Sequence, residues 1–173
     1  VEAMAAGRVS ALLVRGPNPL YELPEQGRVR EALDEVPFIA SFSPYLDETS
    51  ARAHLLLPDH HFLEAWGDHV PRSGVHALVQ PVMTPVYETK QTGDVLLSVA
   101  RRAGVTLPTP VSTFYDYLRD QWREIHGRVA PERGFDAWWT EALQKGTVLT
   151  ADYGVVGTAR ARPVDEALAT EPV

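Results

Sequence analysis

Short apolar runs alternate with helix-forming segments over the first 57 residues, and this alternation constrains the fold more than any other feature of the sequence. Three runs rich in strand-forming residues occupy positions 9–14, 38–42 and 54–57. Each run is continuously apolar, which is typical of strands buried on both faces of a parallel sheet. The order strand, helix, strand, helix, strand therefore predicts an α/β fold, a Rossmann-like parallel sheet with right-handed crossovers and flanking helices.

The segments between these runs carry helix signals. Pro24 suits the first turn of a helix that extends to Val36. Asp47 can cap a short helix that ends at Ala53. The first helix places four apolar residues on one face, namely Val29, Ala32, Leu33 and Val36. Such a face is typical of a helix packed on a core.

Residues 58–91 interrupt this pattern. The prolines and glycines of this segment are Pro58, Pro71, Pro81, Pro85, Gly67 and Gly74. They exclude a long helix and disfavour a central strand. We expect an irregular, Pro-rich but ordered excursion across the carboxyl edge of the sheet.

Three amphipathic helices are predicted after this excursion. The first has Thr92 as its cap, stops at Gly104 and has an apolar stripe of Val95, Leu96, Val99, Ala100 and Ala103. The stripes of the other two comprise Phe114, Tyr117, Leu118, Trp122 and Ile125, and Phe135, Trp138, Trp139, Ala142 and Leu143, with Gly146 behind them. Helical spacing places the Trp138–Trp139 pair in a core or interface rather than on a stacking platform.

These signals divide the chain into three regions. We predict a Rossmann-like domain over 1–105, an α-helical extension over 106–147 and a poorly structured tail over 148–173, with a possible turn near Ala167. Val1 is not an initiator methionine, and the residues after it resemble the end of a helix. We therefore expect the chain to be a fragment of a longer protein.

Composition excludes several classes of site and partner. The chain has no cysteine, which rules out disulfides, thiolate zinc sites and thiolate-bound iron–sulfur clusters within it. A formal charge of -7 without a basic stripe argues against nucleic acid as a partner. No apolar run approaches the roughly 20 residues that span a bilayer, so no direct membrane insertion is expected.

The loop Gly16-Pro17-Asn18-Pro19 follows the first predicted strand. It therefore lies at the carboxyl end of the sheet, where open α/β folds bind ligands. Asn18 could present its amide to a ligand, although Asn between prolines is also ordinary turn chemistry. The Gly-x-Gly-x-x-Gly, P-loop and Gly-x-Ser-x-Gly fingerprints are absent, and we assign no catalytic residue.

Asp59, His60, His61 and Glu64 cluster after the third predicted strand. Imidazoles and carboxylates can bind zinc or a non-haem metal, but adjacent histidines outside a helix point apart, and no i, i+4 pair supports a site. We predict a hydrogen-bonded loop and no metal ligands, with a small metal-binding protein as the weaker alternative. Glu64 could hold this loop by accepting backbone N–H bonds.

Two longer strings carry a family resemblance, LLVRGPNPLYELP and FIASFSPYLDETSARAHLLLPDHHFLEAWGDHV. They resemble the molybdopterin oxidoreductase superfamily, also called the dimethyl sulfoxide reductase family, over about residues 1–105. In that family one strand ends in Gly-x-Asn-Pro, a second leads to a Glu-Thr-Ala-like helix, and a third ends in Leu-Pro before a Glu and a Gly. The matching residues are Gly16, Asn18, Pro19, Glu48, Thr49, Ser50, Leu57, Pro58, Glu64 and Gly67.

The resemblance implies a central α/β domain that helps to enclose one half of a bis-pterin guanine dinucleotide cofactor. If the cofactor is retained, the residues implied to bind it are Gly16, Asn18, Pro19, Glu48, Thr49, Glu64, Gly67 and Gly74. Family members that bind it usually carry an Asn-x-x-Gly-Arg-like segment. This chain has Pro71-Arg-Ser-Gly-Val75 there, so Gly74 is present without the Asn and the Arg.

The string LEAWGDHVPRSGVHALVQPVMTPVYETKQTGDVLL and the Trp-rich helices resemble one branch, the molybdopterin-oxidoreductase-like iron–sulfur subunit of bacterial alternative complex III. That branch keeps the fold without the molybdenum cofactor, and a separate region holds its iron–sulfur clusters. The resemblance implies a scaffold or docking domain of an electron-transfer subunit in a respiratory quinol-oxidising complex, with no cofactor within this fragment. Its partners would be the remaining domains of the parent chain and other respiratory subunits.

The resemblance also implies a bacterial parent that is peripheral to the cytoplasmic membrane, on its periplasmic side. The alternative is the cofactor-enclosing domain of a true molybdenum or tungsten bis-pterin oxidoreductase. In that case the fragment would share molybdopterin guanine dinucleotide with the rest of the parent.

Overall fold

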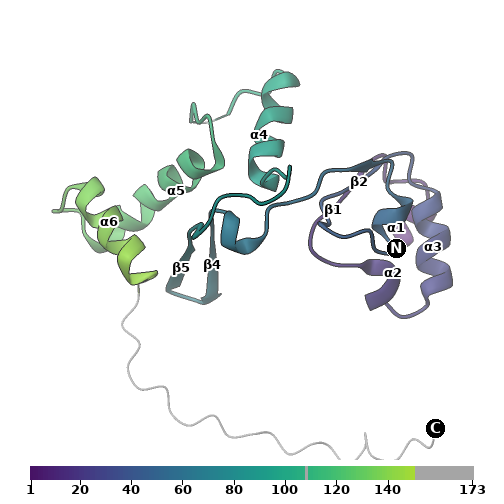
Figure 1. The fold of residues 1–173 in the computed structure, drawn as a ribbon, viewed down its shortest axis with the longest axis horizontal. Coiled ribbons are helices and arrows are strands. Elements are labelled where there is room, and N and C mark those ends of the chain that lie inside the picture. The colour runs from purple at the N-terminus through teal and green to yellow at the C-terminus, as the bar shows by residue number, and fades with distance from the viewer. Residues whose placement is uncertain (108, 151–173) are drawn as a thin grey trace, which may run out of the picture.

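The computed structural model describes residues 1–107 and 109–150 and shows an α/β lobe, a hairpin and three longer helices (Figure 1). The strands of the lobe are β1 (Leu12–Val14), β2 (Ile39–Ser41) and β3 (Leu55–Leu56). They form a parallel sheet in the order β1-β2-β3, in which Leu12 pairs with Ile39 and Ala40 with Leu55. The predicted α/β class with a parallel sheet is confirmed.

One short helix precedes the first strand of the lobe, and the other helical segments connect the strands. They are α1 (Glu2–Ala5), α2 (Pro19–Glu22), α3 (Gln26–Asp34) and the 3₁₀ turn η1 (Ser50–Arg52). The predicted helix after Asp47 is only this 3₁₀ turn. Asp47 Oδ1 accepts a hydrogen bond from the Ser50 N–H at 2.7 Å, so the carboxylate binds the first residue of the turn, but the N-cap position is Thr49 rather than Asp47.

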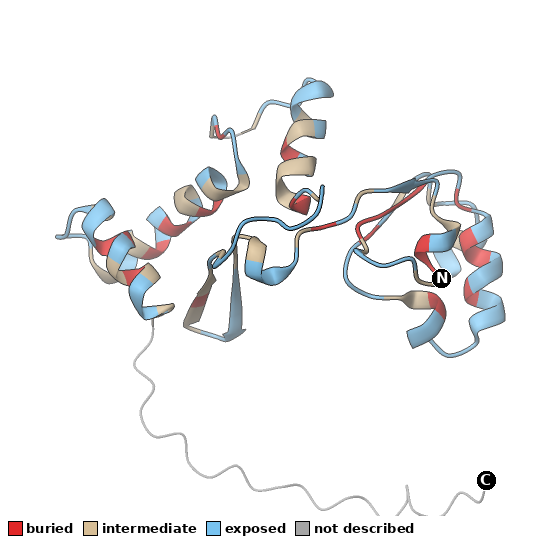
Figure 2. Cartoon of the chain, in the orientation of Figure 1, coloured by how far each residue is buried: buried red, intermediate tan, exposed pale blue. Residues whose placement is uncertain are grey.

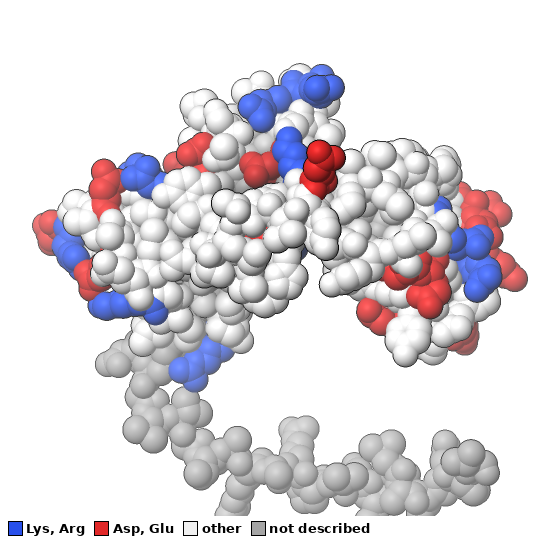
Figure 3. Space-filling model, in the orientation of Figure 1, with Lys and Arg blue, Asp and Glu red and all other residues white. Residues whose placement is uncertain are grey.

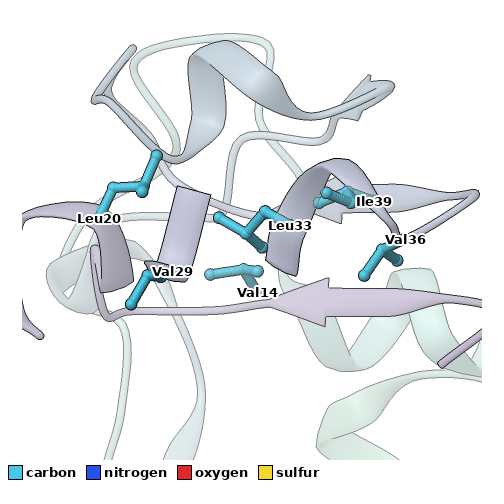
Figure 4. Packing of buried hydrophobic residues seen from close by; sticks show 6 residues of the cluster. All are labelled: Val14, Leu20, Val29, Leu33, Val36 and Ile39. Atoms are coloured by element: carbon cyan, nitrogen blue, oxygen red, sulfur yellow. The ribbon is translucent and has the colours of Figure 1, made fainter. Parts of the chain in front are cut away.

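The core of the lobe lies between α3 and the sheet (Figure 4). Its buried members are Val14, Leu20, Val29, Leu33, Val36 and Ile39. The four residues predicted to share one helix face are all buried, at no more than 2% exposed, but α3 ends at Asp34, so only Val29, Ala32 and Leu33 lie on the helix and Val36 follows it. Packing of this apolar face fixes α3 beside β1 and β2.

The edge strand β3 differs from the expectation. The run 54–57 predicts a buried strand, but β3 is two residues long, and Leu55 and Leu56 are 42% and 41% exposed. No described strand pairs with its outer edge. The prediction of burial is therefore wrong for the described residues, because an apolar run is buried only where another element covers it.

A second sheet lies within and beyond the predicted irregular excursion. Its strands are β4 (Gly67–Arg72), β5 (Val75–Val79) and β6 (Thr147–Leu149), all antiparallel in the order β4-β5-β6. Pro71 is tolerated in β4 because this strand is at the sheet edge and its register shifts between His69 and Arg72. The expectation that residues 58–91 disfavour a central strand is wrong for β5, which lies between β4 and β6 and contains no proline.

The three longer helices are α4 (Thr92–Arg102), α5 (Phe114–Val129) and α6 (Phe135–Lys145). Together with the hairpin, α5 and α6 form a second core, whose buried members are Leu118, Trp122, Ile125, Trp138, Trp139 and Ala142. Trp122 is fully buried, and its Nε1–H donates to Asp68 Oδ2 at 2.8 Å. Figure 2 shows these buried faces turned inward along α5 and α6. No helix of the described part of the chain is long and apolar enough to cross a bilayer.

The predicted tail begins inside a strand. Gly146 ends α6 with a φ of 70°, a conformation that glycine adopts without steric cost, and the chain then enters β6. Val148 and Leu149 therefore belong to the second sheet. The rest of the predicted tail from position 151 onward, including the possible turn near Ala167, lies outside the described residues.

Candidate functional site

The loop after β1 forms the carboxyl edge of the parallel sheet. Gly16 has a φ of 90°, and a Cβ added there would meet no atom within 4 Å. Its backbone conformation, rather than a close contact, therefore favours glycine. Asn18 caps α2 through its carbonyl oxygen, which accepts hydrogen bonds from the backbone of Tyr21 and Glu22, and Pro19 is the first helical residue.

The side chains of Asn18, Glu48 and Thr49 form one hydrogen-bonded group. Asn18 Nδ2 donates to Glu48 Oε2 at 2.7 Å, and Asn18 Oδ1 accepts from the Thr49 hydroxyl at 2.6 Å. The Thr49 hydroxyl also accepts from the Leu20 N–H at 3.1 Å. The structure thus brings together four predicted residues from two loops, counting Pro19, which adjoins Asn18. Both the Nδ2 and the Oδ1 atom of Asn18 bond to protein groups.

The carboxylates at this edge remain ionised at neutral pH. The hydrogen bond from Asn18 holds the pKa of Glu48 below its ordinary value. Burial alone would raise the pKa of Asp47, but hydrogen bonds from the Ser50 backbone and from the hydroxyls of Ser43 and Ser50 outweigh it, so this pKa is also lowered. Neither group is suited to act as a general acid near pH 7.

The negative charge of these carboxylates disfavours binding of the anionic cofactor that the resemblance implies. Acidic side chains gather on the side of the lobe around α2 (Figure 3), where Glu22, Asp47 and Glu48 lie close to the Asn18 loop. A dinucleotide carries an anionic diphosphate, which needs free N–H donors or cations. One N–H of the Asn18 amide and the Thr49 hydroxyl already donate to protein groups, and three carboxylates lie close by, so this edge does not fit a diphosphate.

Glu64 holds an irregular loop, as its position predicts. It ends the 3₁₀ turn η2 (Phe62–Glu64), and its carboxylate accepts from the His61 N–H at 3.1 Å and the Val86 N–H at 3.0 Å. The bond from Val86 is the main reason that the pKa of Glu64 lies below its ordinary value. Its carboxylate oxygens therefore bind backbone of this protein.

Gly67 and Gly74 belong to the hairpin. Gly67 begins β4 opposite Val79, and Gly74 has a φ of 75° in the turn between β4 and β5. Figure 1 shows the hairpin apart from α2. The eight residues implied to bind cofactor thus fall into two groups, one at the sheet edge and one around η2 and the hairpin.

A buried carboxylate that sequence reasoning did not assign to this site connects the two parts of the molecule. Asp59 is 8% exposed and accepts hydrogen bonds from Arg15 Nε at 2.8 Å, the Thr92 N–H at 2.7 Å and the His60 N–H at 3.1 Å. We call Arg15, Asp59 and Thr92 the clasp, because they join the end of β1, the segment after β3 and the start of α4. A carboxylate at the N-terminus of a helix, as here at the start of α4, also interacts favourably with the helix dipole.

A cleft of about 460 Å³ lies beside the clasp. Arg15 and Gln91 line it together with the aromatic residues Phe62, Trp66 and Phe114. Gln91 is 6% exposed; its Oε1 accepts from the Trp66 N–H at 2.9 Å, while its Nε2 has no hydrogen-bond partner among the described residues. An unpaired buried amide donor costs roughly 1–3 kcal/mol, so this cleft could accept a ligand with a hydrogen-bond acceptor.

The signal for these residues in the sequence is weak. Asp59 stands out only as a neighbour of two histidines, and Arg15 and Gln91 carry no motif. The histidines form local bonds instead: His60 Nδ1 lies 2.6 Å from Thr89 Oγ1, and His61 Nδ1 accepts from the Leu63 N–H at 3.4 Å. Within residues 1–107 and 109–150, no three His, Asp or Glu side chains form a group that could hold a metal ion.

The sequence is similar to parts of several oxidoreductase subunits. No protein-family profile matches the sequence. Over 168 residues, or 93% of the chain, it is 31% identical to the menaquinone reductase, molybdopterin-binding-like subunit, of Nitratidesulfovibrio vulgaris. It is 45% identical over 58 residues, 34% of the chain, to a subunit of the NADH-quinone oxidoreductase of Streptomyces coelicolor. It is 24% identical over 102 residues, 59% of the chain, to the alpha subunit of the NADPH-Fe(3+) oxidoreductase of Geobacter sulfurreducens.

The chain is short beside these relatives, because it spans 22%, 7% and 12% of their respective lengths. Its structure also resembles part of acetylene hydratase from Pelobacter acetylenicus, with a TM-score of 0.65 and 20% sequence identity. That similarity covers 90% of this chain and 21% of the hydratase chain. At this identity it shows a shared fold.

The parallel sheet, the motif series at its carboxyl edge and these similarities support one class, the molybdopterin oxidoreductase superfamily. The chain aligns with a segment that makes up about one fifth of the length of the Nitratidesulfovibrio relative.

Proposed function

We propose that this chain is a scaffold and docking domain of a molybdopterin-oxidoreductase-like electron-transfer subunit in a respiratory quinol-oxidising complex. The branch proposed is the iron–sulfur subunit of bacterial alternative complex III. The observation that carries this proposal is the alignment of 93% of the chain with a subunit of a menaquinone reductase whose name describes it as molybdopterin-binding-like. The chain contributes no catalytic residue, and iron–sulfur clusters lie elsewhere in the parent.

The sheet edge supports a structural role. The polar atoms of Asn18 and Thr49 bond to protein groups, and the ionised carboxylates of Asp47 and Glu48 do not favour an anionic cofactor. On this proposal the partners are the remaining domains of the parent chain and other respiratory subunits. The parent is bacterial and peripheral to the cytoplasmic membrane, on the periplasmic side.

The cleft beside the clasp favours a second candidate function, the cofactor-enclosing domain of a molybdenum or tungsten bis-pterin oxidoreductase. Gln91 Nε2 and the guanidinium of Arg15 would then donate hydrogen bonds to acceptor atoms of the pterin group. The metal and pterin supply the redox chemistry when bound, whereas this chain would bind and orient them.

The test is elemental analysis of the natively purified full-length protein for molybdenum, tungsten and iron, together with a pterin fluorescence assay. Iron without molybdenum, tungsten or pterin is the result expected for an electron-transfer scaffold. Stoichiometric metal and pterin would overturn it in favour of the second candidate. In that case Gln91→Ala should lower the pterin content, whereas Asn18→Ala, which changes the internally bonded edge, should not.

A further inference from the structure

A second groove, of about 680 Å³, lies between the end of β3 and one side of α4. We call it the α4 groove. Its lining residues are Leu57, Lys90, Val95, Ser98, Val99, Arg101 and Arg102. The apolar lining residues are Leu57, just after β3, and Val95 and Val99 of α4. The cationic ones are Lys90, Arg101 and Arg102. The groove is therefore both apolar and basic.

The apolar part of the α4 groove coincides with residues whose sequence pattern predicts burial. Val99 belongs to the predicted apolar stripe of α4 but is 56% exposed, and Leu96 on the same helix is 44% exposed. The helix buries Thr92 and Leu97 instead. On the other wall, Leu57 follows the exposed leucines of β3. An amphipathic helix and an apolar edge strand normally face another element, and no described residue fills this place.

The basic part of the groove is formed by Lys90, Arg101 and Arg102. No ion pair between described residues involves Lys90, Arg101 or Arg102. Lys90 Nζ contacts the Ser98 hydroxyl at 3.4 Å, and Arg101 donates to the carbonyls of Leu97 and Ser112, both at 3.3 Å. Figure 3 shows basic side chains at the far end of α4, although the whole chain carries a formal charge of -7.

We propose that the α4 groove docks a segment of the longer polypeptide from outside residues 1–173, with an apolar face and flanking carboxylates. The apolar face covers Leu57, Val95 and Val99, and the carboxylates pair with the cations that line the groove. The occupant is the same polypeptide because this fold forms about one fifth of both the Nitratidesulfovibrio relative and the acetylene hydratase chain. The inference rests on the proposed function only in that the chain is part of a larger subunit.

The first test places a photo-crosslinking residue, p-benzoylphenylalanine, at Val99 of the full-length protein, followed by illumination and peptide mass spectrometry. The expected product is an intramolecular crosslink to a peptide outside residues 1–173 that contains Asp or Glu. The same residue at the exposed Glu31 on α3 is the control and should not capture that peptide. Crosslinks only within residues 1–173, crosslinks to a second copy or another protein, or no crosslink would each overturn the proposal.

The second test reverses the charge of the groove. Lys90→Glu combined with Arg102→Glu should lower the crosslink yield from position 99 about tenfold, which corresponds to about 1.4 kcal/mol. Arg8→Glu combined with Arg30→Glu changes the net charge equally at exposed sites and should leave the yield unchanged. Replacing the captured acidic residues by Lys should restore the yield of the groove variant. An unchanged yield in the groove variant would show that charge does not guide docking.

These tests are separate from the test of function. The metal and pterin content reports on the proposed electron-transfer role, whereas the crosslink reports on the groove. A protein that binds pterin and still gives the crosslink would overturn the proposed function and leave the docking proposal standing.

Discussion

At the scale of single residues, Thr49 has two bonds that depend on one hydroxyl. It is 2% exposed, donates to Asn18 Oδ1 and accepts from the Leu20 N–H. Thr49→Val keeps the shape of the side chain but leaves both groups unpaired. We expect the free energy of unfolding to fall by about 1–3 kcal/mol, measured by urea denaturation. Thr106→Val, at an exposed position, is the matched control and should change it little.

The pH dependence of stability tests the bonds made by Asp47. Its pKa in the folded protein lies below the ordinary value of 3.8, because hydrogen bonds to the charged form outweigh burial. The stability that these hydrogen bonds give to the folded protein is therefore fully present above the ordinary pKa of Asp47. It is lost as the pH falls through the lower pKa of the folded state.

Urea denaturation from about pH 6 down to about pH 2 measures this effect. Wild type should lose stability through the acidic part of this range, and Asp47→Asn should lose less there while being less stable near neutral pH. Glu31→Gln, at an exposed position, should follow the wild-type curve. Parallel curves for wild type and Asp47→Asn would contradict the assignment.

At the scale of elements, replacing glycine by alanine should have opposite effects on stability at two positions. Gly146 has a φ of 70° at the end of α6, so Gly146→Ala should destabilise the protein by about 1–2 kcal/mol. Gly127 lies inside α5, where an added Cβ meets nothing within 4 Å. Gly127→Ala should therefore stabilise by about 0.5–1 kcal/mol. Tryptophan fluorescence during denaturation measures both, and equal signs would contradict this account.

The second core depends on Trp122, which joins α5 to β4. The residue is fully buried, and its indole N–H donates to Asp68. Trp122→Phe removes that bond and leaves a small cavity, so we expect a loss of about 2–4 kcal/mol in unfolding free energy. Trp66→Phe, at a partly exposed position, should cost less. Thermal unfolding followed by circular dichroism can compare the two variants.

At the scale of the whole molecule, the clasp connects the α/β lobe to α4. Asp59→Ala removes the acceptor for Arg15, His60 and Thr92 and leaves the buried Thr92 N–H unpaired. We expect amide hydrogen exchange at Thr92 to accelerate about tenfold or more, because local opening becomes easier. Glu132→Ala, at an exposed position, should not change it. Unchanged exchange in Asp59→Ala would show that the clasp does not join the two parts.

Sequence reasoning recovered the features that depend on neighbours along the chain. The buried face of α3 and the buried Trp138–Trp139 pair follow from helical periodicity, which local composition determines. The loop held by Glu64 also follows from a nearby motif, since its carboxylate caps η2. Part of the candidate site was predictable for the same reason, because each motif marks the end of one strand.

Other features depend on residues that are far apart in the sequence. The clasp joins Arg15 to Asp59, and the hairpin gains β6 from beyond three helices, so neither has a local pattern. The sequence did not predict the exposure of Leu55 and Leu56. An apolar run shows which side chains favour burial, but it does not show whether another element packs over them. By itself the sequence determined the parallel α/β class and the apolar faces, through periodicity and turn chemistry. The tertiary structure alone decided which faces meet, because contact between distant segments depends on how the whole chain packs.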